Sequence, residues 1–394
     1  MEPKFKSHRT LPVADIDITI DDKDKITMNN KSTFNPKKLH HKIKNKHPLT
    51  KKEKWIVVIE ILIVLAAIAV VVFIFTRSTK LEKGTAQKTN KVVVVKPIVS
   101  RLTGLPVTAA QEALPVTGVM IENSDDARPQ SGLSQAGVVY EALAEGGITR
   151  FLALFEDNTT SSIGPVRSAR PYFIDWLLPY DAGYAHVGGS PTALSEIQSL
   201  NVKDLNQFYN SSAYQRISSR AAPHNVYTST PSLLSLESSK GWTKSDFTGF
   251  PRKADSPNKA PNASKITLNI AGSDMNVQYQ YNPTKNDYLR SEGGSPMIDA
   301  GNNQQISPKV VIAMVVPWTD GALDSSNAYY TVYSDVGSGT ADIFQDGVVY
   351  PGTWTKTSQN SKIQFTNAAG VPIKLNAGQT WITALGESSE IIYQ

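Results

Sequence analysis

Between Glu122 and Asn225 the sequence concentrates polar and glycine-containing motifs among apolar segments. They read ENSDDARPQSGL, EGGITRF, GPVRSARPYF, HVGGSP and APHN. Together they contain four arginines, several carboxylates and two histidines. Because a buried charge is costly unless it is paired or engaged with a ligand, these motifs predict one organised polar site.

The arginines of these motifs are candidates for holding an anionic ligand. A guanidinium is planar, and its donors suit bidentate binding of carboxylate or phosphate. The four candidates are Arg128, Arg150, Arg167 and Arg170. The alternative is an internal salt-bridge network, in which they pair with nearby carboxylates. The possible partners are Glu122, Asp125, Asp126, Glu141, Glu145 and Asp175.

The histidines are few enough to be informative. Four of the six lie ahead of residue 50, which leaves His186 and His224 for the rest of the chain. An imidazole can act as acid, base or ligand near neutral pH, so two from separate segments could meet across one cleft. The alternative for each is a structural histidine that is hydrogen-bonded inside the fold.

The motif that follows His186 predicts an anion cradle. A strand that ends in Gly188 and Gly189 and leads into a helix leaves backbone N–H groups free, and Ser190 adds a hydroxyl. Asn225, next to His224, completes the predicted ligand-binding set. Alternatively, the glycines only form the turn and Ser190 only caps the helix.

The paired carboxylates allow a further chemistry. Asp125 and Asp126 could supply acid–base groups for glycan cleavage or oxygen ligands for a cation, and Asp125 is our candidate if the protein is an enzyme. The chain has no cysteine and no H-E-x-x-H or calcium-loop pattern. We therefore expect no metal site and no cofactor.

The elements that must position these residues alternate between strand and helix patterns. Residues 137–144 and 148–155 predict a hairpin that turns at Glu145-Gly146-Gly147. Pro171 and Ser190-Pro191 predict helix starts, and residues 183–187 predict a buried strand between the two helices. A mixed α/β domain over residues 112–250 follows.

The remaining sequence predicts a second domain rich in β-strands. Residues 251–264 are rich in Pro, Lys, Asn and Ser and predict an interdomain linker. From residue 265 to 394 the strand-length runs are KITLNI, VVIAMVV, AYYTVYS, GVVY and TWITAL. Turn pairs separate them, which is typical of an antiparallel barrel or sandwich. The predicted fold class is α+β.

One apolar segment ahead of these domains predicts a membrane anchor. Residues 55–76 are long enough for a helix to cross the roughly 30 Å hydrocarbon core of a bilayer, with Glu60 as the ionisable exception. Residues 1–54 hold fourteen Lys and Arg against seven Asp and Glu, and we expect them to be disordered. Positive charge beside a first helix favours the cytoplasmic side, so residues 77–111 would form an extracytoplasmic stalk.

The longer motifs resemble the YerB-like lipoprotein family of bacteria. The resemblance rests on ARPQSGLSQAGVVYEALAEGGITRFLALF, IGPVRSARPYFIDW, HVGGSPTAL, APHNVYT, DGVVYPGTW and LNAGQTWI. It covers roughly residues 112–390 and implies a tethered protein of the cell envelope with a mixed N-terminal and a β-rich C-terminal domain, without a settled activity. This chain lacks the lipid-accepting cysteine of that pattern and has the apolar segment instead.

Two classes of function stay open at this point. The favoured hypothesis is a binding or regulatory module of the envelope that captures an anionic wall-derived ligand or a partner protein. The alternative is an envelope hydrolase or transferase acting on wall polymer, with His186, His224 and carboxylates as acid–base groups. We expect membrane lipid as a partner through residues 55–76, and no nucleic acid.

Overall fold

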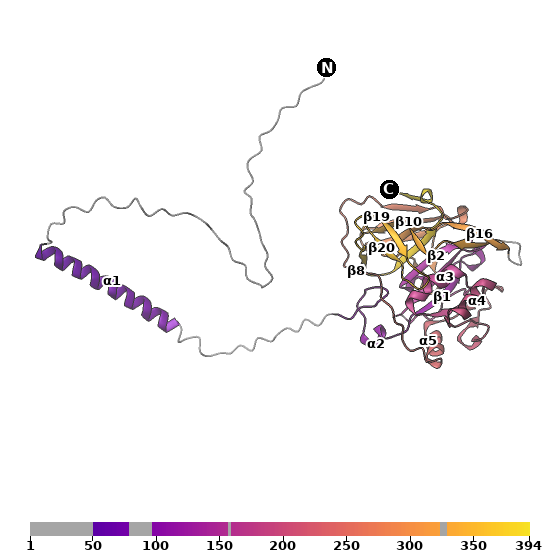
Figure 1. Ribbon diagram of the computed structural model, residues 1–394, viewed down its shortest axis with the longest axis horizontal. Helices are drawn as coiled ribbons and strands as arrows, with labels where there is room; N and C mark the ends of the chain where they lie inside the picture. Colours follow the sequence, from indigo (N-terminus) through magenta and orange to yellow (C-terminus); the bar gives the residue numbers. More distant parts are fainter. Residues whose placement is uncertain (1–49, 79–96, 157–158, 324–328) are drawn as a thin grey trace, which may run out of the picture. The chain divides into compact units, whose positions relative to one another are not determined.

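The computed structural model describes residues 50–78, 97–156, 159–323 and 329–394. The chain divides into two compact units, residues 1–92 and 93–394. The predicted disordered tail lies outside the described residues as far as residue 49. Figure 1 shows the described elements along the chain.

The first unit contains one described helix, α1 (Lys51–Ser78). Its window Lys54–Phe73 has a mean hydropathy of 3.3, and its apolar side chains, such as Trp55 and Leu62, are exposed. By length and composition this helix could cross a membrane.

The second unit is built on a ten-stranded mixed sheet. Both halves of the sequence contribute to it, in the order β20-β19-β18-β15-β22-β2-β3-β1-β4-β5. The N-terminal strands are β1 (Thr117–Glu122), β2 (Val138–Leu143), β3 (Thr149–Phe155), β4 (Gly183–Ala185) and β5 (Lys203–Asp204). The C-terminal strands are β15 (Val310–Val315), β18 (Gly337–Gln345), β19 (Val348–Lys356), β20 (Gln364–Thr366) and β22 (Thr380–Leu385).

The predicted hairpin is present at the centre of this sheet. β2 and β3 pair antiparallel from Val138↔Leu154 to Leu143↔Thr149. Gly146 and Gly147 both have positive φ, of 60° and 75°, a conformation that glycine adopts without steric cost. All side chains of β2 and β3 are buried, as expected for strands that are covered on both faces.

A second, five-stranded antiparallel sheet is formed by the C-terminal half alone. Its order is β12-β11-β10-β9-β23. The strands are β9 (Lys265–Leu268), β10 (Val277–Asn282), β11 (Asp287–Glu292), β12 (Ser295–Pro296) and β23 (Ile391–Tyr393). Four further pairs are β6 (Gln215–Arg216) with β7 (Val226–Tyr227), β8 (Arg252–Lys253) with β21 (Leu375–Asn376), β13 (Ile298–Asp299) with β14 (Gln304–Gln305), and β16 (Trp318–Leu323) with β17 (Tyr329–Tyr333).

The fold class is α+β, as predicted, but the C-terminal half is not purely antiparallel. β22 runs parallel to both of its neighbours, β2 and β15. Through β22 the strands of residues 112–250 and 265–394 share hydrogen bonds, so the two halves build one sheet and one core.

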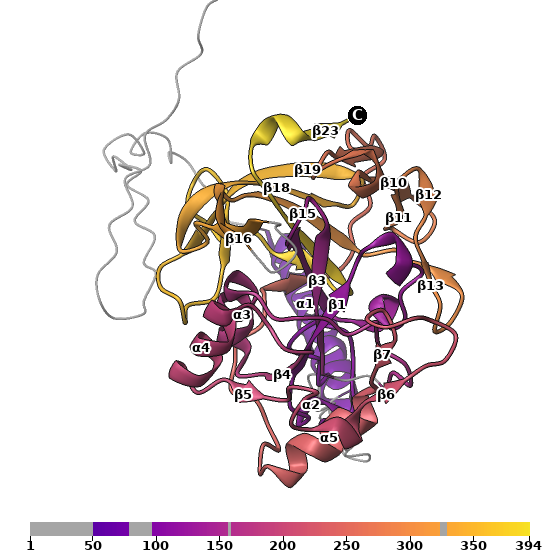
Figure 2. The same cartoon turned by 90° about the vertical axis from the view of Figure 1, so that its right-hand side faces the viewer.

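Short helices complete the unit. They are α2 (Ala109–Glu112), α3 (Pro171–Leu177), α4 (Pro191–Ser199) and α5 (Thr230–Ser239). Pro171 lies in the first turn of α3, and Ser190 caps α4 by accepting a hydrogen bond from the Ala193 N–H, as the sequence predicts. Figure 2 shows α4 and α5 in the lower part of the unit and β10, β18 and β19 in its upper part.

Residues 97–111 of the predicted stalk and the predicted linker are packed onto the unit, whereas residues 79–96 of the stalk lie outside the described residues. Leu102, in the predicted stalk, is 1% exposed, and neighbouring Arg101 forms a 2.7 Å ion pair with buried Glu156. In the predicted linker, β8 pairs with β21, and Ala263 is fully buried. Their polar composition misleads because a few apolar residues are enough to dock each segment.

Candidate functional site

Arg167, Glu122 and His224 meet because three chain segments run side by side. The segment 165–167 follows the end of β1, with Glu122 N–H donating to Pro165 O and Arg167 N–H donating to Met120 O, each at 2.9 Å. Its other edge meets β7, where Val166 N–H donates to Val226 O at 2.7 Å. The loop between β6 and β7 therefore brings His224 to the end of β1.

Glu122 is the centre of this group. Its Oε1 lies 3.0 Å from His224 Nδ1 and 3.4 Å from Arg167 Nε, and it accepts a hydrogen bond from Ser124 Oγ at 2.9 Å. His224 Nε2 lies 3.8 Å from Asp126 Oδ2. We call these five residues, Glu122, Ser124, Asp126, Arg167 and His224, the Glu122 cluster.

The Glu122 cluster keeps hydrogen-bonding capacity unused. Glu122 has a side chain that is 6% exposed, and its Oε2 is buried without a partner among the described residues. Among the described residues the Nη atoms of Arg167 form no hydrogen bond, and the Arg167 side chain is 27% exposed. Burial lowers the pKa of Arg167, Glu122 opposes this shift, and Arg150 adds to it.

Arg150 and Arg170 form a separate, closed ion-pair group. Arg150 Nη2 lies 3.0 Å from Glu145 Oε2, and its Nη1 donates to Ser168 O at 2.8 Å. Arg170 contacts Glu145 Oε1, and its guanidinium lies over the ring of Tyr330. Both arginine side chains are more than nine-tenths buried. Arg150 and Arg170 thus form an internal salt-bridge network, the alternative to ligand binding, and they have little access to a ligand.

His186 is a structural histidine. The residue is fully buried; Nδ1 lies 2.7 Å from Gly188 O, and Nε2 lies 3.0 Å from Asp204 Oδ1. Burial acts to raise the pKa of Asp204, but its interactions with His186, the Asn206 N–H and Lys240 together outweigh burial and lower it. No contact joins His186 to His224 within the described residues, so the structure does not assemble them as an acid–base pair.

The predicted anion cradle is largely occupied by the protein itself. Gly188 N–H donates to Asn206 Oδ1 at 3.2 Å, and Ser190 N–H donates to Ala169 O at 3.3 Å. Ser190 Oγ serves as the cap of α4. Gly189 packs against Ala169, where an added Cβ would lie 3.1 Å from the Ala169 Cβ. Asn225 accepts a hydrogen bond from Arg216, at 2.7 Å.

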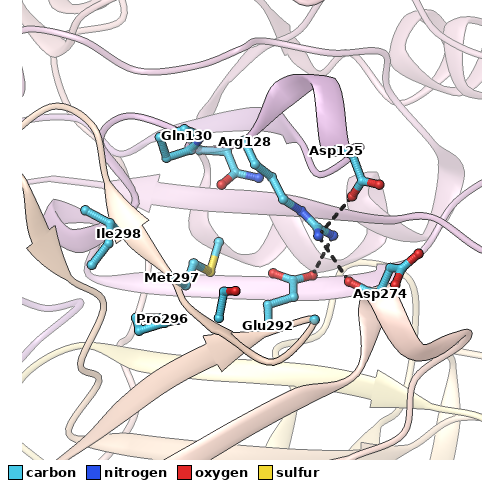
Figure 3. A pocket seen from close by; sticks show the side chains of 11 residues that line it. Asp125, Arg128, Gln130, Asp274, Glu292, Pro296, Met297 and Ile298 are labelled. Atoms are coloured by element: carbon cyan, nitrogen blue, oxygen red, sulfur yellow. Dashed lines mark hydrogen bonds and ion pairs between the residues drawn. The ribbon is translucent and has the colours of Figure 1, made fainter.

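Arg128 lines a cleft of about 600 Å³ beside η1 (Asp125–Ala127). In Figure 3 its guanidinium reaches Asp125, the Asp274 carbonyl and Glu292. The pairs with Asp125 and Glu292 are each 3.1 Å long. The cleft walls include Glu292, Pro296, Met297 and Ile298, which the sequence analysis did not single out because only the tertiary fold brings β11 and β12 to this loop.

Comparisons with known proteins support the family resemblance. The N-terminal domain model of a "Protein of unknown function (DUF3048)" matches residues 102–243, and the corresponding C-terminal domain model matches residues 266–382. A Bacillus subtilis (strain 168) protein named "Putative lipoprotein YerB" is 30% identical over 297 residues, which cover 73% of this chain and 86% of that protein. The chain belongs to the YerB-like family.

A solved YerB structure agrees with this assignment. The crystal structure of YerB from Bacillus subtilis matches with a TM-score of 0.67 and 26% identity, covering 75% of this chain and 99% of the other. The YerB-like fold therefore extends over most of this chain. The family descriptions state no activity.

Proposed function

We propose that this YerB-like protein is an envelope module anchored in the membrane by α1, with residues 93–394 outside the cytoplasm. Three observations support the proposal: the relative's name as a lipoprotein, the length and apolar character of α1, and the excess of Lys and Arg ahead of it. In this chain, which has no cysteine, the helix would do the work of a lipid anchor.

The anchoring can be tested by protease protection. With the full chain expressed in a bacterial host, protease added to intact protoplasts should degrade residues 93–394 and spare an N-terminal tag. Protection of residues 93–394, with loss of the tag, would reverse the orientation. Extraction of the chain by carbonate would contradict a membrane span.

The ligand of the module, in this proposal, carries an anionic group that binds Arg167. One observation on the Glu122 cluster supports this: among the described residues the Arg167 Nη atoms form no hydrogen bond, and the Arg167 side chain is 27% exposed. A ligand with an anionic group would accept hydrogen bonds from these Nη atoms. A fragment of cell-wall polymer has this chemistry.

A thermal-shift screen of the full chain in detergent tests this proposal. Muropeptides and anionic wall polymers should raise the unfolding midpoint of the parent protein, and Arg167→Ala should abolish the shift. Arg167→Lys keeps the charge but loses the planar fork, so it should retain only part of the shift. Lys285→Ala removes an exposed cation from a turn of the five-stranded sheet and serves as the control. A shift that Arg167→Ala leaves unchanged would exclude this site.

The Glu122–His224 pair favours one second candidate, an envelope hydrolase or transferase. A carboxylate bound to Nδ1 orients an imidazole so that Nε2 can accept or donate a proton. This arrangement replaces the predicted His186–His224 pair. Incubation with wall digests, followed by product analysis, should then show turnover that His224→Ala removes and His186→Asn retains.

A further inference from the structure

We propose that the Arg128 cleft is a second binding site, which takes an ammonium group on an aliphatic stem, such as a lysine side chain of a peptide. The cleft lies between the η1 loop and strands β11 and β12, as Figure 3 shows. Its volume of about 600 Å³ lies within the range of small-molecule and side-chain sites. Arg128 alone would make the cleft positive, but carboxylates make the cleft negative.

Arg128 is unavailable as an anion receptor because protein atoms take its donors. Its Nε donates to Asn123 Oδ1. Its Nη1 donates to Asp274 O at 3.0 Å and pairs with Asp125, and its Nη2 donates to Asn123 O and Glu292 Oε1 at 3.1 Å each. Its Nη2 also donates to Met275 Sδ, so these hydrogen bonds and the Asp125 ion pair leave few of its five N–H donors for a ligand.

The charges that remain open to a ligand are carboxylates. The Asp125 side chain is 72% exposed, and Asp274 is exposed as well. Glu292 is buried behind them, where its Oε1 pairs with Arg128 and its Oε2 lies 3.4 Å from Arg290. Burial raises the pKa of Glu292. Among the residues that line the cleft, even with Glu292 neutral, two exposed carboxylates outnumber one paired guanidinium; Arg220, which donates to Pro129 O, lies outside this lining. The cleft therefore attracts a cation.

The apolar part of the wall determines what carries the charge. Pro129, Pro296, Met297 and Ile298 line the cleft beside the carboxylates. A compact inorganic cation would leave these side chains unused, whereas a lysine buries its aliphatic stem on apolar surface and keeps its ammonium among polar groups. Charge and shape together select a lysine side chain.

Calorimetric titration of the full chain in detergent, at low salt, tests the proposal. The probe is the dipeptide acetyl-Leu-Lys-amide, and acetyl-Leu-norleucine-amide is its neutral counterpart. The lysine peptide should bind more tightly, and salt should weaken its binding. Asp274→Asn and Asp125→Asn should each weaken it roughly two- to fivefold, as expected for exposed charge pairs. Asp274→Asn is the cleaner variant because only the backbone carbonyl of Asp274 bonds to Arg128.

Matched controls separate this site from the Glu122 cluster. Asp320→Asn removes an exposed carboxylate on β16 and should leave the affinity unchanged, as should Arg167→Ala. An unchanged thermal midpoint in Asp274→Asn would show that its fold is intact. Equal affinity for the lysine and norleucine peptides would overturn the proposal, and so would lysine binding that neither Asp274→Asn nor Asp125→Asn weakens.

Discussion

Glu141 on β2 and Arg290 on β11 form a fully buried, bidentate ion pair between the two sheets. Arg290 Nη1 lies 3.0 Å from Glu141 Oε2, Nη2 lies 2.8 Å from Glu141 Oε1, and both side chains have no exposed surface. Trp381 Nε1 donates to the same carboxylate at 2.9 Å. The guanidinium also lies over the ring of Trp381, 4.4 Å from its centroid. This buried ion pair thus joins the N-terminal and C-terminal halves of the chain.

Arg290→Met should strongly destabilise the protein. Removal of one partner leaves the Glu141 carboxylate buried and uncompensated, which typically costs about 3–5 kcal/mol. Urea unfolding followed by tryptophan fluorescence measures this loss. The double variant Glu141→Gln with Arg290→Met removes both charges and should recover part of it. If the double variant lost as much free energy of unfolding as Glu141→Gln and Arg290→Met lose together, the two charges would not depend on each other.

Because Asp335 and Asp175 are buried together, the free energy of unfolding should fall as pH rises. Burial and the charge of Asp175 raise the pKa of Asp335 to about 7, whereas its ordinary value is 3.8. Asp175 Oδ1 and Asp335 Oδ2 are buried without a partner among the described residues. As pH rises, the unfolded carboxyl loses its proton first, so the free energy of unfolding decreases between about pH 4 and 7 and levels off above.

The variant Asp335→Asn should flatten this pH profile. An amide does not ionise, so the variant should gain stability relative to the parent at pH 8, on the order of a few kcal/mol, and little at pH 4. Denaturant unfolding at a series of pH values provides the measurement. Asp320→Asn, which changes an exposed aspartate, is the control. If the free energies of unfolding of the parent and Asp335→Asn changed with pH in parallel, Asp335 would not be the group that causes the pH dependence.

His186→Ala should reduce stability and leave ligand binding at the Glu122 cluster intact. The substitution removes the imidazole that bridges Gly188 O and Asp204 in the interior, and a lost buried hydrogen-bond partner costs about 1–3 kcal/mol. Thermal unfolding measures the loss, and the ligand-induced shift reports on the cluster. If the folded variant lost its ligand shift, His186 would belong to the binding site.

Ser190→Ala should cost about 1 kcal/mol through the loss of the α4 cap. The hydroxyl accepts one hydrogen bond, from the Ala193 N–H at the start of the helix. Ser190→Asp retains an acceptor and should preserve most of the stability. Chemical denaturation of the three proteins checks this order. An unchanged stability in Ser190→Ala would show that the cap contributes nothing.

Local signals in the sequence were sufficient for the elements around the site. The Gly146-Gly147 turn, Pro171 in the first turn of α3 and the Ser190 cap each depend on residues within a few positions, so their chemistry is readable along the chain. The family could also be recognised, since its motifs are long and ordered. The apolar pattern of α1 likewise depends only on neighbouring residues.

The charge partners could not be read in the same way, because pairing depends on register and on segments distant in sequence. The sequence offered six carboxylates for four arginines, but only the fold assigns Glu145 to Arg150 and Arg170 and leaves Arg167 with Glu122. The partner of Glu141 is Arg290, which lies 149 positions away. Sequence alone determined which residue types carry charge and where helices and turns begin. The tertiary structure decided which charges neutralise each other, because Coulomb and hydrogen-bond energies depend on distances that only the folded chain defines.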